Sequence, residues 1–222
     1  MLLGGDPWDF VDYIRDNQET FYELLRQHLE LVGLSVLLGI LIALPLAILA
    51  NRIDVLAKPL NWLANIGQTI PSLAVLGLAL PYLGIGFRPA LFALTILAVL
   101  PIFLNTYVGI QEADRAVVDA ARGMGASNTQ LLVLVELPLA SPVIYAGVRT
   151  AIIQNIGLAT LAAYIGAGGF GDWILQGLAM VSPPILFAGA VSVAVLAMLT
   201  EIIMGRLRYL VIPSGLRIDS KR

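Results

Sequence analysis

The sequence predicts an all-α membrane protein with about five transmembrane helices. Of its 222 residues, 59% are hydrophobic and only 13% are charged, whereas soluble domains carry about 25% charged residues. A spanning helix needs about 20 mostly apolar residues to cross the bilayer core. The stretches that meet this length are residues 29–50, 59–80, 89–110, about 138–165 and 184–205. We find no internal repeat or low-complexity tract, so we expect a single domain.

The composition excludes several kinds of site. The sequence has no cysteine and a single histidine, His28, which argues against thiol catalysis, disulfides and metal centres built from these residues. The formal net charge of −2 offers no basic surface for nucleic acid. We therefore expect no catalytic residue, no bound metal and no cofactor on this chain.

Residues 1–27 are acidic and are expected to form an amphipathic helix. Trp8, Phe10 and Tyr13 are interspersed with aspartates and glutamates, a pattern typical of helices that lie on a membrane surface or pack at one end of a bundle. No basic stretch precedes them, so the segment does not resemble a cleaved signal peptide. The expected organisation is this external segment, a transmembrane domain over 28–206 that includes a cytoplasmic loop at 111–137, and a cytoplasmic tail at 207–222.

The distribution of Lys and Arg predicts the orientation. Cytoplasmic loops carry an excess of these residues. With the N-terminus outside and the C-terminus in the cytoplasm, Arg15, Arg26 and Arg88 lie outside, and Arg149 lies within a span. The others then lie in the cytoplasm: Arg52, Lys58, Arg115, Arg122, Arg206, Arg208, Arg217, Lys221 and Arg222. The loop at 111–137 therefore faces the cytoplasm.

This cytoplasmic loop is longer than a simple connection needs and contains the stretch VVDAARGMGASNTQLLVLVELP. Its small residues allow a partner to approach closely, and Val117 and Met124 supply an apolar face. Gly125 can end a helix by adopting a left-handed conformation. We expect a short helix at 117–127 that either docks into a groove on a cytoplasmic partner or is an ordinary surface helix.

The same stretch resembles the EAA motif of permease subunits in ATP-binding cassette (ABC) importers of type I. That motif is Glu-Ala-Ala, three residues, Gly, nine residues, Ile, one residue, Leu-Pro. The spacing here matches throughout, with Asp in place of Glu and Val in place of Ile. The matching residues are Asp119, Ala120, Ala121, Gly125, Val135, Leu137 and Pro138.

The resemblance implies a coupling helix that docks into an ATPase subunit and transmits its closure to the membrane helices. It also implies two ATPase subunits, a second permease that is the same chain or a paralogue, an external substrate-binding protein, and a location in the prokaryotic cytoplasmic (inner) membrane. The phosphate-binding pattern G-x-x-x-x-G-K-[ST] occurs nowhere in the chain. ATP and Mg are therefore expected on the partner ATPase.

Three further stretches resemble permeases for quaternary ammonium osmoprotectants such as glycine betaine, carnitine and choline. They are residues 68–86, 100–114 and 156–178. A permease for methionine or another small solute is the alternative. A multipass membrane enzyme is a remote alternative, because the acids in or beside the spans, Glu30, Glu136 and Glu201, fall on different segments.

Residues 166–171 satisfy the pattern G-x-G-x-x-G. A dinucleotide site requires a strand before this pattern and a helix after it, whereas here it follows a membrane-length apolar run. We interpret it as a turn between the fourth and fifth spans. A short interfacial helix follows, with Asp172 as its expected cap.

Polar side chains inside the spans mark a candidate translocation path. In the second span, the spacings between Asn61, Asn65, Gln68 and Ser72 are four, three and four residues. These spacings place the four side chains on one face of a helix. At membrane depth such groups face a water-filled cavity or form hydrogen bonds between helices, and both interpretations stay open. The candidates are Asn61, Asn65, Gln68, Thr69, Ser72, Asn105, Gln154 and Asn155.

Arg149 lies within the fourth span, about 16 Å along the helix from Pro138 at 1.5 Å per residue. An arginine at this depth needs a partner. We expect a structural ion pair with Glu201 in the fifth span, with Glu136 as the second candidate.

Overall fold

The computed structural model describes residues 6–213 and 215, and these residues form helices without any strand. Helices long and apolar enough to span a membrane are α2 (Gln18–Arg52), α5 (Phe87–Gln111), the run Asn128–Ile165 that contains α8 (Leu137–Ala162), and α10 (Pro183–Val211). A fifth span is possible if α3 (Asp54–Gly67) and α4 (Ser72–Leu83) are counted together. The expected all-α membrane fold is therefore confirmed.

The second span differs from the prediction of one helix over 59–80. Its two halves, α3 and α4, are bent by 103° at the short link between them. Pro71 occupies the N-cap position of α4 with φ −57° and ψ 129°. A proline lacks the N–H that would continue the helix and disfavours helical backbone in the residue before it. The expectation that Asn61, Asn65, Gln68 and Ser72 share one helical face is therefore wrong.

The first span also begins earlier than expected. The helices α1 (Phe10–Asp16) and α2 are separated at Asn17, after which α2 continues without interruption for 35 residues. Residues 18–28 contain no glycine or proline, so nothing in their backbone preference ends the helix before the apolar run. The second half of the expected N-terminal helix is thus the beginning of the first span.

The centre of the bundle consists of α2, α5 and α8, in which α5 makes the most extensive helix–helix contacts, with α2 on one side and α8 on the other. Close approach depends on small residues: a Cβ on Gly39 of α2 would lie 2.9 Å from the Ala98 Cβ of α5. A Cβ on Gly147 of α8 would lie 2.6 Å from the Asn105 Cβ of α5. Small residues at helix contacts are the usual means of packing in membranes, because they let backbones approach.

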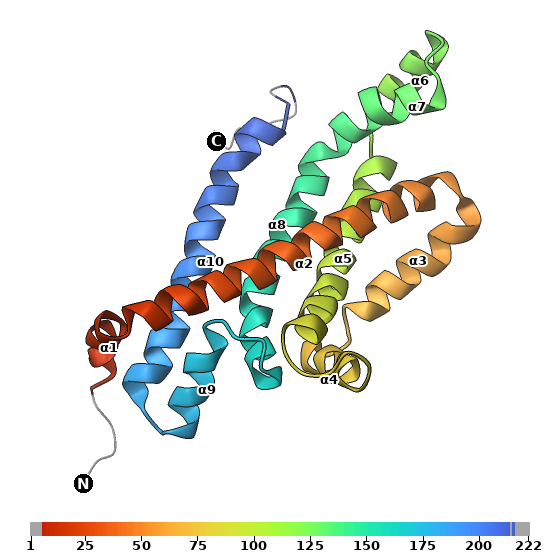
Figure 1. Ribbon diagram of the computed structural model, residues 1–222. Coiled ribbons are helices and arrows are strands. Elements are labelled where there is room, and N and C mark those ends of the chain that lie inside the picture. Colours follow the sequence, from red (N-terminus) through yellow and green to blue (C-terminus); the bar gives the residue numbers. More distant parts are fainter. Residues whose placement is uncertain (1–5, 214, 216–222) are drawn as a thin grey trace.

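The N-terminal helix α1 packs at one end of the bundle against α10 and the short helix α9 (Gly171–Ala179) (Figure 1). Phe10, Tyr13 and Phe21 surround the buried Phe170 and Trp173. The rings of Tyr13 and Trp173 meet edge to face, with centroids 5.4 Å apart. Packing at a bundle end was one of the two positions expected for this segment.

The glycine-rich stretch at 166–171 leads from the 3₁₀ turn Ala163–Ile165 into α9. Gly166, Gly168 and Gly169 all have positive φ, which a side chain would strain. The expected cap is wrong: the N-cap of α9 is Phe170, and Asp172 lies in the first turn. Partial burial of Asp172 raises the pKa of its carboxyl.

The last spanning helix also ends later in the sequence than expected. The last helix, α10, continues to Val211, so the expected tail at 207–222 begins inside a helix. The remainder of that tail lies outside the described residues, except for 212, 213 and 215. Residues 1–5 of the expected N-terminal segment are also outside them.

Candidate coupling segment and translocation cleft

The candidate coupling segment, residues 115–131, consists of two short helices joined by a turn and extends beyond one end of the bundle (Figure 1). Its first helix, α6, covers Arg115–Gly123. The Asp114 side chain caps α6 by accepting a hydrogen bond from the Ala116 N–H at 2.9 Å. A side-chain oxygen at this position satisfies one of the free N–H groups of the first turn. The helix expected at 117–127 therefore begins two residues earlier and ends at Gly123, before the turn at 124–126.

Gly125 ends α6 with φ +90°. The Ala126 N–H donates to the Ala121 carbonyl at 3.2 Å, and the Gly125 N–H donates to the Arg122 carbonyl at 3.0 Å. This is the hydrogen-bond pattern of a glycine-terminated helix, in which the left-handed residue reverses the chain. The expected left-handed conformation of Gly125 is therefore confirmed.

A second cap fixes the other side of the turn. Ser127 accepts a hydrogen bond from the Gln130 N–H at 3.3 Å, and the Ser127 N–H donates to the Gln130 Oε1 at 2.8 Å. This reciprocal capping box begins α7 (Asn128–Leu131). With caps on both sides, the turn at 124–126 holds α6 and α7 in a defined geometry.

The residues that match the EAA motif divide between two environments. Ala121 is buried at 7% exposure, whereas Asp119 and Ala120 are exposed. Val117 and Met124 leave 44% and 83% of their surface uncovered. Thus α6 uses Ala121 to lie against the rest of the chain and presents small and apolar groups outwards.

The other matching residues connect this segment to the membrane helices. The π-helix Leu132–Glu136 contains Val135, and α8 begins with Leu137 and Pro138. Glu136, at the end of the π-helix, is buried at 7% exposure and forms an ion pair with Arg52 at the end of α2. Sequence reasoning missed this pair, and considered Glu136 only as a second partner for Arg149.

Arg149 of α8 contacts Glu201 of α10, the partner expected for it. The Arg149 Nε donates to the Glu201 Oε2 at 3.1 Å. Their side chains are 37% and 43% exposed. Close by, the Tyr145 hydroxyl donates to the Met204 carbonyl, which adds another link between α8 and α10.

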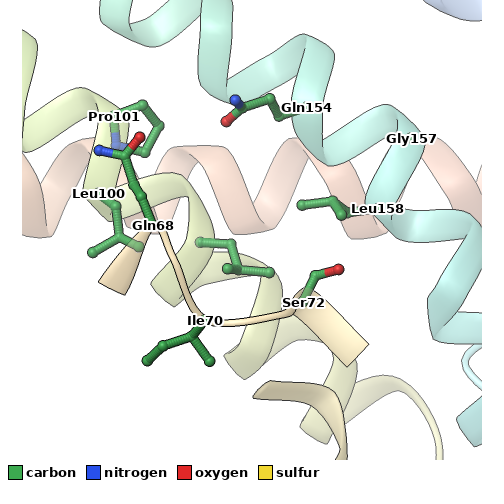
Figure 2. A pocket seen from close by; sticks show the side chains of 9 residues that line it. Gln68, Ile70, Ser72, Leu100, Pro101, Gln154, Gly157 and Leu158 are labelled. Carbon is green, nitrogen blue, oxygen red and sulfur yellow. The ribbon is translucent and has the colours of Figure 1, made fainter. Parts of the chain in front are cut away.

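Some of the polar candidates line a cleft of about 360 Å³ beside the bend between α3 and α4. Figure 2 shows Gln68 from the end of α3, Ser72 from the start of α4 and Gln154 from α8 around this space. The rest of the lining is Ile70, Leu97, Leu100, Pro101, Gly157 and Leu158. The bend therefore brings together polar groups that the predicted straight helix would have arranged differently.

The remaining candidates do not line this cleft. Asn155 is buried at 1% exposure, where its Nδ2 donates to the Ser35 Oγ at 2.9 Å and to the Leu94 carbonyl at 3.1 Å. It thus connects α8 to α2 and α5. The others donate to backbone carbonyls three or four residues earlier in the chain, and they are Asn61, Asn65, Thr69 and Asn105.

Among solved structures, the chain is similar to a chain of the MetNI methionine ABC transporter in an inward-facing conformation. The TM-score is 0.81 at 22% identity, covering 89% of this chain and 99% of the other. A second is an amino acid ABC transporter crystallised with histidines, with a TM-score of 0.71 at 20% identity, covering 93% and 97%. These likenesses concern the fold.

The sequence is similar to curated proteins over almost its whole length. The carnitine transport permease protein OpuCB of Listeria monocytogenes is 40% identical over 93% of this chain and 95% of its own. The glycine betaine/carnitine/choline transport system permease protein OpuCB of Bacillus subtilis is 41% identical with the same coverage. The osmoprotectant import permease protein OsmW of Salmonella typhimurium is 39% identical over 94% and 100%. Residues 35–211 also match a family model, and the chain belongs to that family, the inner membrane components of binding-protein-dependent transport systems.

Proposed function

We propose that this chain is the membrane-spanning subunit of an ABC importer that takes up glycine betaine, carnitine, choline or a related osmoprotectant. Its family makes it a transport subunit of the inner membrane rather than an enzyme. The substrate class is supported by the names of relatives that are 39–41% identical over at least 93% of the chain. Because these relatives align over nearly their full length, the comparison covers whole permeases rather than one shared segment.

The observation that carries the mechanism is α6, a helix capped at both ends that extends beyond the bundle (Figure 1). In the proposed complex α6 docks into a groove of an ATPase subunit through Val117, Ala120 and Met124. The ATPase subunit binds ATP and Mg and closes. Its closure moves α6, and α6 transmits this movement to α8 through the π-helix. The full assembly contains two ATPases, a second permease and an external substrate-binding protein.

The arrangement of the helices supports the proposed orientation. The coupling segment and the C-terminal end of α10 lie at one end of the bundle, and α1 and α9 lie at the opposite end (Figure 1). The first end carries Arg52, Arg115 and Arg122 among the cytoplasmic cations expected from the positive-inside rule. We place this end in the cytoplasm and α1 outside.

The cleft at the bend is the proposed translocation path. Its polar groups are the amides of Gln68 and Gln154 and the hydroxyl of Ser72, and its lining includes no aromatic ring and no charged side chain. A quaternary ammonium ion is held tightly over aromatic faces, so this cleft is suited to weak, transient contact. Selectivity therefore resides mainly in the external binding protein.

The test is gentle purification of the tagged chain from its native membrane, followed by measurement of the mass of the intact complex. We expect two ATPase chains and two permease chains. The binding protein of the same system is then titrated with glycine betaine, carnitine, choline and methionine, and we expect binding of the quaternary ammonium compounds. Binding of methionine alone would replace the proposed substrate, and recovery without any ATPase would contradict the proposed assembly.

A further inference from the structure

The ion pair between Arg52 and Glu136 joins parts of the chain that are 84 residues apart. Arg52 is the last residue of α2, and Glu136 is the last residue of the π-helix that leads into α8. Both guanidinium Nη atoms face the carboxylate, with Nη1 at 3.4 Å from Oε1 and Nη2 in contact with Oε2. Two parallel contacts fix the direction of the pair as well as its distance.

The two partners differ in their access to solvent. The side chain of Glu136 is 9% exposed and that of Arg52 is 36% exposed. A buried carboxylate that loses its cation becomes an unpaired charge in a poorly solvated site, which is strongly unfavourable. Arg52 also lies at the C-terminus of α2, where a cation is favoured by the helix dipole. Burial of Glu136 and the helix dipole at Arg52 therefore both favour an intact ion pair when the surrounding helices move.

The pair is placed between the coupling segment and the central helices. Glu136 lines a cleft of about 320 Å³ together with Val118, Asp119 and Arg122 of α6. It also lines a cleft of about 340 Å³ with Arg52 and Asn51 of α2. Thus one carboxylate borders both the docking helix and the end of the first span.

The end of α2 is fixed to the core at the same place. Asn51 Nδ2 donates to the Ala47 carbonyl at 2.9 Å within α2 and to the Tyr107 carbonyl of α5 at 3.3 Å. A displacement of Arg52 therefore acts on α2 and, through its neighbour, on α5. These two helices and α8 form the centre of the bundle.

We propose that the Arg52–Glu136 ion pair is the link that passes movement of α6 to α2, so that the first span moves together with α8. Both are positioning residues, since they act through the helices they connect. The π-helix supports this role, because such turns are rare and are frequently found at functional sites. The inference rests on the proposed function, since it requires an ATPase that moves α6.

The test compares variants in the complete transporter, with ATPases and binding protein, reconstituted in lipid vesicles. Glu136→Gln removes the charge with little change in shape, and Arg52→Glu combined with Glu136→Arg reverses the pair. The control is Glu30→Gln, which breaks the exposed Arg26–Glu30 pair of α2. The readouts are the amount of ATPase that co-purifies, ATP hydrolysis, and solute taken up per ATP hydrolysed.

We expect Glu136→Gln to retain its ATPase and to hydrolyse ATP, while solute uptake per ATP falls about fivefold or more, the lower end of typical couplings between sites. The reversed pair should recover most of this loss, and Glu30→Gln should match the wild type. Unchanged uptake per ATP in Glu136→Gln would overturn the inference. If Glu136→Gln fails to assemble, the reversed pair decides: wild-type uptake per ATP supports the link, and loss of assembly or uptake overturns it. A wild-type chain without an ATPase would instead overturn the proposed function.

Discussion

Substitution of Gly125 by aspartate is expected to abolish transport while leaving membrane insertion intact. Gly125 has φ +90°, and a Cβ placed on it would have no neighbour within 4 Å. A side chain is therefore limited by backbone strain rather than by space. That strain is about 1–2 kcal/mol for an ordinary residue and less for Asn or Asp. A carboxylate at the C-terminus of α6 adds about 0.3–1 kcal/mol of unfavourable interaction with the helix dipole.

Strain and charge together amount to at most about 3 kcal/mol, and 1–3 kcal/mol corresponds to roughly 5- to 150-fold in the population of the native turn. Docking then requires the new carboxylate to leave water beside the ATPase, and an unpaired buried charge is strongly unfavourable. Gly125→Asn is the matched control, because it has the same shape and tolerance for left-handed backbone without the charge. It should retain part of the uptake.

The assay measures the amount of the chain in the membrane, the ATPase that co-purifies with it, and uptake of glycine betaine into vesicles. For Gly125→Asp we expect normal insertion, reduced recovery of the ATPase and no uptake. Normal uptake by this variant would refute the reasoning. Equal loss in Gly125→Asp and Gly125→Asn would show that shape, rather than charge, limits docking.

Four other substitutions, which make three predictions, separate structural from transport roles. Arg149→Ala or Glu201→Ala should lower the thermal stability of the purified protein by on the order of 1 kcal/mol, since both side chains are partly exposed; full folding and transport in both variants would contradict a structural ion pair. Asn155→Leu should destabilise the protein by about 1–3 kcal/mol, because it removes two buried hydrogen bonds, and unchanged stability in thermal unfolding would refute its linking role. Gln154→Leu should slow uptake at saturating binding protein without changing solute affinity of the binding protein, and an unchanged rate would argue against the cleft as the path.

The positions of the spans could be predicted because length and apolar composition alone define them. The end of α6 could also be predicted, because the left-handed turn there is a local property of Gly125. The direction of the second span could not be predicted. Pro71 indicates a weak point, but the 103° bend depends on how α3 and α4 pack against α5.

Among the polar contacts, too, some could be predicted from the sequence and others depend on the packed fold. Arg149 and Glu201 were predicted as partners because each is an isolated charge in or beside an apolar span. Arg52 and Glu136 lie at the predicted ends of spans, where water is a sufficient partner, so their pairing depends on the packed fold. Asn155 and Gln154 are neighbours in sequence, yet one is buried in the core and the other lines the cleft. Their roles depend on the rotation of α8 about its axis, which its largely apolar sequence, without a distinct polar face, leaves undetermined.

The most direct test of the account is site-specific crosslinking from α6. The chain has no cysteine, so Met124→Cys, at an 83% exposed position on the coupling segment, introduces a single reactive thiol. Tyr82→Cys, at an 87% exposed position in α4, is the control. With a thiol-reactive photocrosslinker in native membranes, we expect the ATPase to be crosslinked to residue 124 and not to residue 82. Absence of the ATPase from the products at residue 124, or equal yields at both positions, would contradict docking through α6.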